Sequence, residues 1–157
     1  MPYNVETLVV GCGNILYKDD GFGPEVIKEL KKYFEENSLP DQTAIVDGGT
    51  GASYHIFTFP EECWKKVIVI DSIEFGGEPG EVRILKPSEV PAGRYENPHA
   101  RPGEHLIEEL EKQCEVVVVG CQPKEVPVID IDMGLTTPIK EAIPKAINII
   151  LKEIGAL

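Results

Sequence analysis

Three residues of the chain have side chains suited to chemistry and positions that favour it: Asp20, Asp71 and His99. Asp20 lies in a glycine-containing loop, and Asp71 directly follows the apolar run Val67–Ile70. His99 lies in a proline-rich stretch, where a histidine has no apolar core to pack against. Two carboxylates and one imidazole form an incomplete coordination sphere, which suits a borderline divalent metal with positions open for other ligands. A carboxylate in such a loop could instead transfer protons.

Each of these residues also has a structural interpretation. Asp19 or Asp20 could cap the helix that follows the loop, a role that aspartate fills well. Asp71 could be a solvated residue at the end of a strand, or a cap. His105 lies at the start of a short amphipathic segment and competes with His99 as the functional histidine.

The loop Gly11–Gly23 does not have the pattern of a nucleotide-binding loop. Its start, Gly11-Cys12-Gly13, matches the first part of a dinucleotide-binding fingerprint, but Leu16 stands where the third glycine is needed. Asp19 and Asp20 lie where a phosphate would meet the helix N-terminus, and two carboxylates there would repel an anion. The spacing therefore argues against a phosphate site.

Composition predicts one domain over residues 1–157, with 42% hydrophobic residues and enough chain for a sizeable core. The formal net charge of -12 argues against a nucleic-acid surface, which needs a basic patch. We find no apolar run long enough to span a membrane and no secretory leader before the first apolar segment. We therefore expect a soluble, cytoplasmic monomer that binds neither nucleic acid nor membrane.

The cysteines are scattered and form no CxxC pair, which excludes a zinc ribbon by spacing. They lie in or beside apolar stretches, so we expect buried, reduced thiols. Cys12, in the glycine-containing loop, is the one candidate nucleophile, but no histidine is near it in sequence. The four residues are Cys12, Cys63, Cys114 and Cys121.

Short apolar runs alternate with amphipathic segments along the chain, a pattern typical of α/β proteins. We expect a three-layer αβα sandwich whose sheet has about five strands, mainly parallel, with helices on both faces. Pro144 should kink or restart the last helix. The expected strands are Thr7–Val10, Thr43–Asp47, Val67–Ile70, Glu81–Leu85 and Val116–Val119, with helices from Pro24, through Tyr54 and Phe57, from Gly103 and from about Pro138.

This order of elements places the candidate residues together. Asp20 and Asp71 follow the first and third strands, and the carboxyl ends of parallel strands lie at one edge of a sheet, where open α/β sheets carry their chemistry. The segment that contains His99 can reach the same edge. The sequence thus predicts one site at the carboxyl edge of the sheet.

Several motifs in order resemble those of one family. GCGNILYKDDGFG resembles the signature of hydrogenase maturation endopeptidases, which trim the C-terminus of nickel-iron hydrogenase large subunits. The resemblance continues through DGGT, VIVID, the Pro98-His99 pair, GCQP and Gly134-Leu135-Thr136. ENPHARPGEHLI and VIDIDMGLTT resemble the subgroup that serves deazaflavin-coenzyme-reducing hydrogenases. The family has a mainly parallel α/β sheet, in agreement with the fold expected from the residues.

The resemblance implies that Asp20, Asp71 and His99 are both the metal-binding and the catalytic residues. The metal would be nickel supplied by the precursor of the hydrogenase large subunit, and the protein would hold no tightly bound cofactor of its own. The nickel could polarise the scissile carbonyl, activate a water or orient the peptide. An aspartate could instead act as general base while the nickel only positions the substrate.

Two other functions are compatible with parts of the sequence. A non-catalytic, metal-dependent chaperone of the same precursor would use the same three ligands without cutting the chain. A peptidyl-tRNA hydrolase-like esterase also has a glycine-asparagine loop, but the acidic composition of this chain disfavours binding to tRNA.

Overall fold

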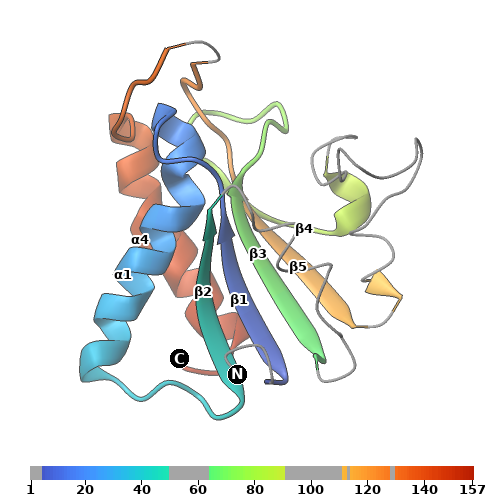
Figure 1. Cartoon of the computed structure of the whole chain (residues 1–157). Coiled ribbons are helices and arrows are strands. Elements are labelled where there is room, and N and C mark those ends of the chain that lie inside the picture. Colours follow the sequence, from blue (N-terminus) through green and yellow to red (C-terminus); the bar gives the residue numbers. More distant parts are fainter. Residues whose placement is uncertain (1–4, 50–63, 91–110, 113, 128–129) are drawn as a thin grey trace.

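A computed structural model describes residues 5–49, 64–90, 111–112, 114–127 and 130–157 of the chain. In the described residues α1 follows β1 and α4 follows β5, as Figure 1 shows. The elements are β1 (Thr7–Cys12), the 3-10 helix η1 (Lys18–Gly21), α1 (Phe22–Glu36), β2 (Thr43–Gly49), β3 (Lys66–Ser72), β4 (Val82–Leu85), the 3-10 helix η2 (Pro87–Glu89), β5 (Glu115–Cys121) and α4 (Thr137–Glu153).

The five strands form one sheet in the order β2-β1-β3-β5-β4. β2, β1, β3 and β5 pair in parallel, whereas β4 pairs with β5 antiparallel at the edge. The expected α/β class with a mainly parallel sheet of five strands is confirmed. The strands extend beyond the expected apolar runs: β3 includes Asp71 and Ser72, and β5 continues to Cys121.

Both faces of the central strands are buried, which is why their sequences are continuous apolar runs. Alternate residues of β1 and β3 contribute to two separate clusters: Val9, Ile68 and Ile70 lie on one face, while Val67 and Val69 lie on the other. Burying these β-branched side chains on a pleated surface stabilises the sheet by about 1.5–3 kcal/mol for each side chain.

α1 and α4 pack side by side on the same face of the sheet (Figure 1). Their buried residues join the cluster that contains Val9, Ile68 and Ile70. Pro24 lies in the first turn of α1, as expected, because an amide there has no partner within the helix. The helices expected on the other face of the sheet, through Tyr54 and from Gly103, lie outside the described residues.

Pro144 was expected to kink or restart the last helix; α4 runs through Pro144 as one helix, so the expectation of a restart at this residue was wrong. Pro144 lies on the exposed side of the helix, and Lys140, one turn earlier, is also exposed. Water can therefore reach the carbonyl that loses its usual donor, which reduces the cost of a proline inside a helix. No helix in the described ranges has the length and apolar composition that crossing a membrane requires.

Candidate functional site

The loop between β1 and α1 brings Asp20 to the carboxyl edge of the sheet. Gly13 has a φ of 135°, and a Cβ at this position would overlap the carbonyl oxygen of Asp20. The amide of Asn14 can therefore approach Asp20 and donates to its carbonyl at 3.1 Å and to its carboxylate Oδ2 at 3.0 Å. Asn14 also accepts from the amide of Leu16 at 2.9 Å, which closes the turn.

The second carboxylate oxygen of Asp20 meets the end of β3. The hydroxyl of Ser72 donates to Asp20 Oδ1 at 3.4 Å. Ser72 follows Asp71 directly, so the structure places Asp20 beside the strand end that carries Asp71. The backbone register agrees, because Gly11 pairs with Ile70 one residue before this point. The expected meeting of the first and third strand ends at one edge is thus present in the structure.

Asp71 lies inside the protein. Its exposed fraction is 2%, so the interpretation as a solvated strand-end residue was wrong. Asp71 pairs in register with Gly120 of β5. A buried carboxylate is costly unless polar groups compensate it, and such residues are concentrated at functional sites.

Asp19 has a role that the sequence did not reveal. Neither η1 nor α1 has a capping hydrogen bond from a side chain, and the N-cap of α1 is Gly21, so neither aspartate is a helix cap. Asp19 is instead fully buried and accepts hydrogen bonds from the amides of Lys124, Glu125 and Thr136 at 2.8–2.9 Å. Its carboxylate ties the loop before α1 to the segment between β5 and α4.

Gln122 is a second residue whose role sequence reasoning missed. Its side chain is buried, and its Oε1 accepts from the amides of Phe75 and Gly77 at 2.9 and 3.1 Å. These bonds hold the loop that follows Asp71 against the end of β5. The motif GCQP contains Gln122, but no local pattern indicates a partner that is 45 or more residues away in the chain.

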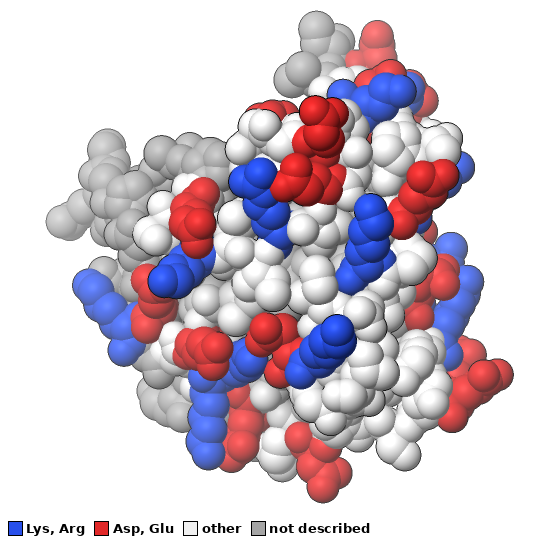
Figure 2. Space-filling model, turned by 180° about the vertical axis from the view of Figure 1, so that it is seen from behind, with Lys and Arg blue, Asp and Glu red and all other residues white. Residues whose placement is uncertain are grey.

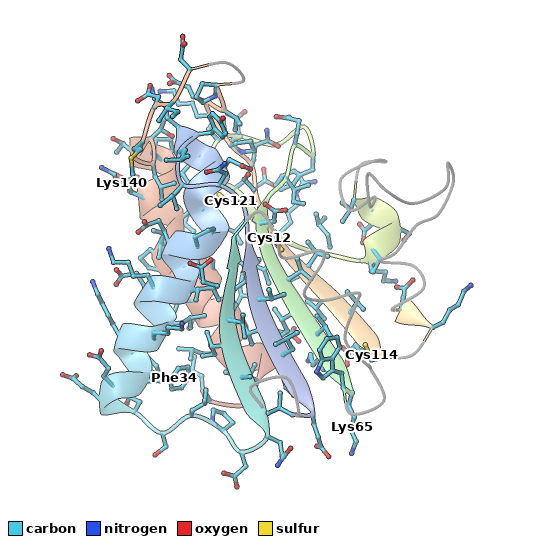
Figure 3. The ribbon with its side chains drawn as sticks, viewed as in Figure 1. Cys12, Phe34, Lys65, Cys114, Cys121 and Lys140 are labelled. Atoms are coloured by element: carbon cyan, nitrogen blue, oxygen red, sulfur yellow. The ribbon has the colours of Figure 1, made fainter. Side chains whose placement is uncertain are left out.

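Two thiols lie near this edge of the sheet. Cys12 and Cys121, labelled in Figure 3 at the upper ends of their strands, are buried and form no disulfide within the described part of the chain, as expected for reduced thiols. Burial and the nearby charge of Asp19 raise the pKa of the Cys121 thiol to about 12, so it is not ionised near neutral pH. Cys114 is partly buried and forms no disulfide with a described residue, and Cys63 lies outside the described residues.

The candidate histidines, His99 and His105, lie outside the described residues. Within the described ranges, no three side chains of the metal-binding types form a group that could hold an ion. To hold a metal ion, Asp20 and Asp71 would need further ligands, either from the remainder of the chain or from a substrate. On the face shown in Figure 2, basic and acidic side chains are interspersed, unlike the basic stripe of a nucleic-acid surface.

Comparisons with known proteins agree on one family. The model of the family described as hydrogenase maturation protease matches residues 24–153. The chain is 53% identical over 155 residues to the coenzyme F420 hydrogenase subunit delta of Methanothermobacter thermautotrophicus, covering 99% of this chain and 98% of the relative.

Solved structures give the same result. The crystal structure of the hydrogenase 3 maturation protease aligns with a TM-score of 0.73 and 25% identity, covering 93% of this chain and 89% of that chain. A [NiFe] hydrogenase maturation protease from Thermococcus kodakarensis KOD1 aligns with a TM-score of 0.68 and 26% identity, covering 96% of this chain and 93% of that chain.

Proposed function

Because the chain belongs to the hydrogenase maturation protease family, we propose that it removes the C-terminal extension from a nickel-loaded precursor of a hydrogenase large subunit. The enzyme is an endopeptidase: water is added across one peptide bond, giving a new carboxylate and a free amine. The observation that carries the proposal is the fixed position of Asp20 beside the end of β3, next to the buried Asp71.

Two carboxylates held at one edge suit a metal that arrives with the substrate. The Asn14 amide and the Ser72 hydroxyl orient the Asp20 carboxylate, so its binding geometry exists before the precursor docks. We assign His99 as the third ligand of the substrate's nickel, because carboxylate and imidazole both suit a borderline divalent ion. A precursor that lacks nickel would then lack the group that these residues bind.

The nickel of the precursor would supply Lewis-acid chemistry or orient the scissile peptide. The contribution of the chain is to grip this ion and to offer a carboxylate that can accept a proton from the attacking water. Asp20 is only half-buried and accepts a hydrogen bond at each carboxylate oxygen, so it stays oriented and accessible.

For the identity of the substrate, we propose a hydrogenase that reduces a deazaflavin coenzyme. The relative from Methanothermobacter thermautotrophicus is named as a subunit of the coenzyme F420 hydrogenase, and it matches this chain along nearly its whole length. The two motifs that resemble this subgroup, ENPHARPGEHLI and VIDIDMGLTT, support the same assignment.

The test is incubation of the protein with nickel-loaded and nickel-free precursor, followed by measurement of the precursor's mass. We expect the loaded precursor to lose its C-terminal extension and the nickel-free precursor to keep its full mass. Equal cleavage of both would contradict nickel recognition. An unchanged mass of the loaded precursor, despite binding, would contradict proteolysis of this substrate and identify a chaperone instead.

A further inference from the structure

Residues 130–134 form an exposed edge beside the loop that carries Asp20. The amide of Asp132 donates to the carbonyl of Leu16 at 2.9 Å, and the carbonyl of Asp132 accepts from the amide of Lys18 at 2.7 Å. Tyr17 and Asp132 therefore form a parallel bridge. Both backbone polar groups of Asp132 are paired with the loop that carries Asp20, on the side of the edge that faces the protein.

Ile131 and Met133, on either side of Asp132, form the outer side of the edge. Successive residues of extended backbone direct their amides and carbonyls to alternate sides, so those of Ile131 and Met133 face away from the bridge. Within the described part of the chain, these four groups have no hydrogen-bond partner. The two side chains are 65% and 61% exposed. An unpaired edge with exposed apolar side chains is a template for a further extended segment.

A hollow continues from this edge towards the candidate site. Its volume is about 280 Å³, and its walls include Leu135, close after Met133 in the chain, and Gly21, which follows Asp20. Ile15 and Leu135 give the hollow apolar walls. Lys140 also lines it and is labelled beside the start of α4 in Figure 3. The edge, the hollow and the Asp20 loop are thus continuous.

The charges around the edge limit what can dock there. Lys18 is bound by the carboxylates of Glu125 at 2.6 Å and of Asp132 at 3.1 Å, so its charge is already shared. Asp130 is exposed at the start of the edge. A segment with a positive charge is favoured here, whereas a second copy of a chain with net charge -12 is disfavoured.

We propose that the edge at Ile131 and Met133 binds an extended, apolar segment of the hydrogenase precursor that carries a basic residue. The segment adds as a strand beside residues 130–134 and places one apolar side chain in the hollow. This inference rests on the proposed function and specifies how the precursor is held while its nickel is at Asp20. Main-chain hydrogen bonds give the affinity, and the hollow gives the specificity.

The first test compares the double variant Ile131→Asn, Met133→Asn with the wild-type protein. Both side chains are exposed in the free protein, so the melting temperature should stay the same. The KM for nickel-loaded precursor should rise by about tenfold or more, with kcat unchanged, because the lost contacts hold the precursor without touching the reacting bond. Leu39→Asn is the control, since Leu39 is 38% exposed between α1 and β2. A wild-type KM in the double variant would overturn the proposal.

The second test measures hydrogen exchange with a precursor whose scissile bond is replaced by a nonhydrolysable isostere. The amides of Ile131 and Met133 should exchange quickly in the free protein and at least about tenfold more slowly in the complex, because strand addition gives them acceptors. Unchanged exchange in a saturated complex would overturn strand addition.

These tests separate this inference from the proposed function. If the wild-type protein binds the precursor without cutting it, and the amides of Ile131 and Met133 become protected, the proposal of proteolysis is contradicted and the docking edge is supported. If cleavage occurs with a wild-type KM in the double variant, only the docking edge fails. Sedimentation that shows a dimer lost on double substitution would assign the edge to a second copy and overturn the proposal.

Discussion

Asp19 and Thr136, which are 117 residues apart in the chain, are joined directly: the amide and hydroxyl of Thr136 donate to the Asp19 carboxylate at 2.8 and 2.9 Å. The same carboxylate accepts from the amides of Lys124 and Glu125. Since Asp19 precedes Asp20, this contact fixes the candidate metal-binding loop to the segment that leads from β5 to α4.

Asp19→Asn should lower the free energy of unfolding by about 1–3 kcal/mol, because an amide group turns one acceptor oxygen into a donor among buried N–H groups. Urea denaturation measures this change. Asp130→Asn is the control: Asp130 is exposed, and its substitution should stay within about 0.5 kcal/mol. Equal stabilities for Asp19→Asn and the wild type would contradict the role of Asp19 as a buried connector.

Most of the sheet could be predicted from the sequence because its central strands are buried on both faces. Continuous apolar runs such as Val67–Ile70 are typical of buried parallel strands. The order of these strands along the chain then predicts that the loops after them lie at the carboxyl edge of the sheet. The extension of β3 through Ser72 could not be predicted, because polar residues after an apolar run are also typical of the loop that follows a strand. It is the pairing of Asp71 and Ser72 with β5 that continues the strand.

The site was predictable only where local patterns indicate it. The positions of Asp20 and Asp71 after apolar runs predict a shared edge, and the structure brings their two segments together through Ser72. The partners of Asp19 and Gln122 lie far away in sequence, and no periodicity encodes such pairs. The local sequence around Asp19 suggested a helix cap. In the structure its carboxylate instead accepts a hydrogen bond from the distant Thr136.

Gly13→Ala should destabilise the protein by more than the cost of backbone strain alone and should abolish cleavage. Residue 13 has a φ of 135°, and an added Cβ would collide with the backbone of Asp20. Gly76→Ala is the control for strain, since Gly76 has a φ of 80° but no atom within 4 Å of an added Cβ. Gly76→Ala should cost about 1–2 kcal/mol in thermal unfolding. Similar losses for both variants would contradict a tight contact between Gly13 and Asp20.

Stability should fall at high pH partly because of Cys121. Its pKa is raised from the ordinary 9.0 to about 12, so the folded state holds the thiol proton more tightly than the unfolded state. Below pH 9 the thiol keeps its proton in both the folded and the unfolded state, and its contribution to the free energy of unfolding is fully present. Between pH 9 and about 12 only the unfolded state ionises, and the free energy of unfolding decreases.

Comparison of the wild type with Cys121→Ala isolates this effect, because lysines and tyrosines titrate in both proteins. We expect the variant to be less stable at pH 8, since it leaves a cavity, and to lose less stability than the wild type above pH 9. Parallel curves for the two proteins over this range would contradict the raised pKa of the thiol.

His99→Gln should reduce cleavage of nickel-loaded precursor far more than His105→Gln. A glutamine amide is a much poorer ligand for a borderline metal than an imidazole, so loss of the ligand should be seen in substrate affinity and in rate. The measurement is cleavage kinetics with the melting temperature as control. Loss of activity in His105→Gln, with normal activity in His99→Gln, would assign the third ligand to His105.

Asp20→Asn tests the central claim most directly, because asparagine keeps the size of the side chain and removes only its charge. The measurement is the rate at which the variant shortens nickel-loaded precursor, followed by mass, with the melting temperature recorded in parallel. Removing an outer-shell partner of a metal ligand typically costs about 10–100-fold, so loss of the ligand itself should reduce cleavage by at least about 100-fold. We predict this loss with a melting temperature close to that of the wild type. Cleavage at the wild-type rate would contradict the recognition of the substrate's nickel by Asp20.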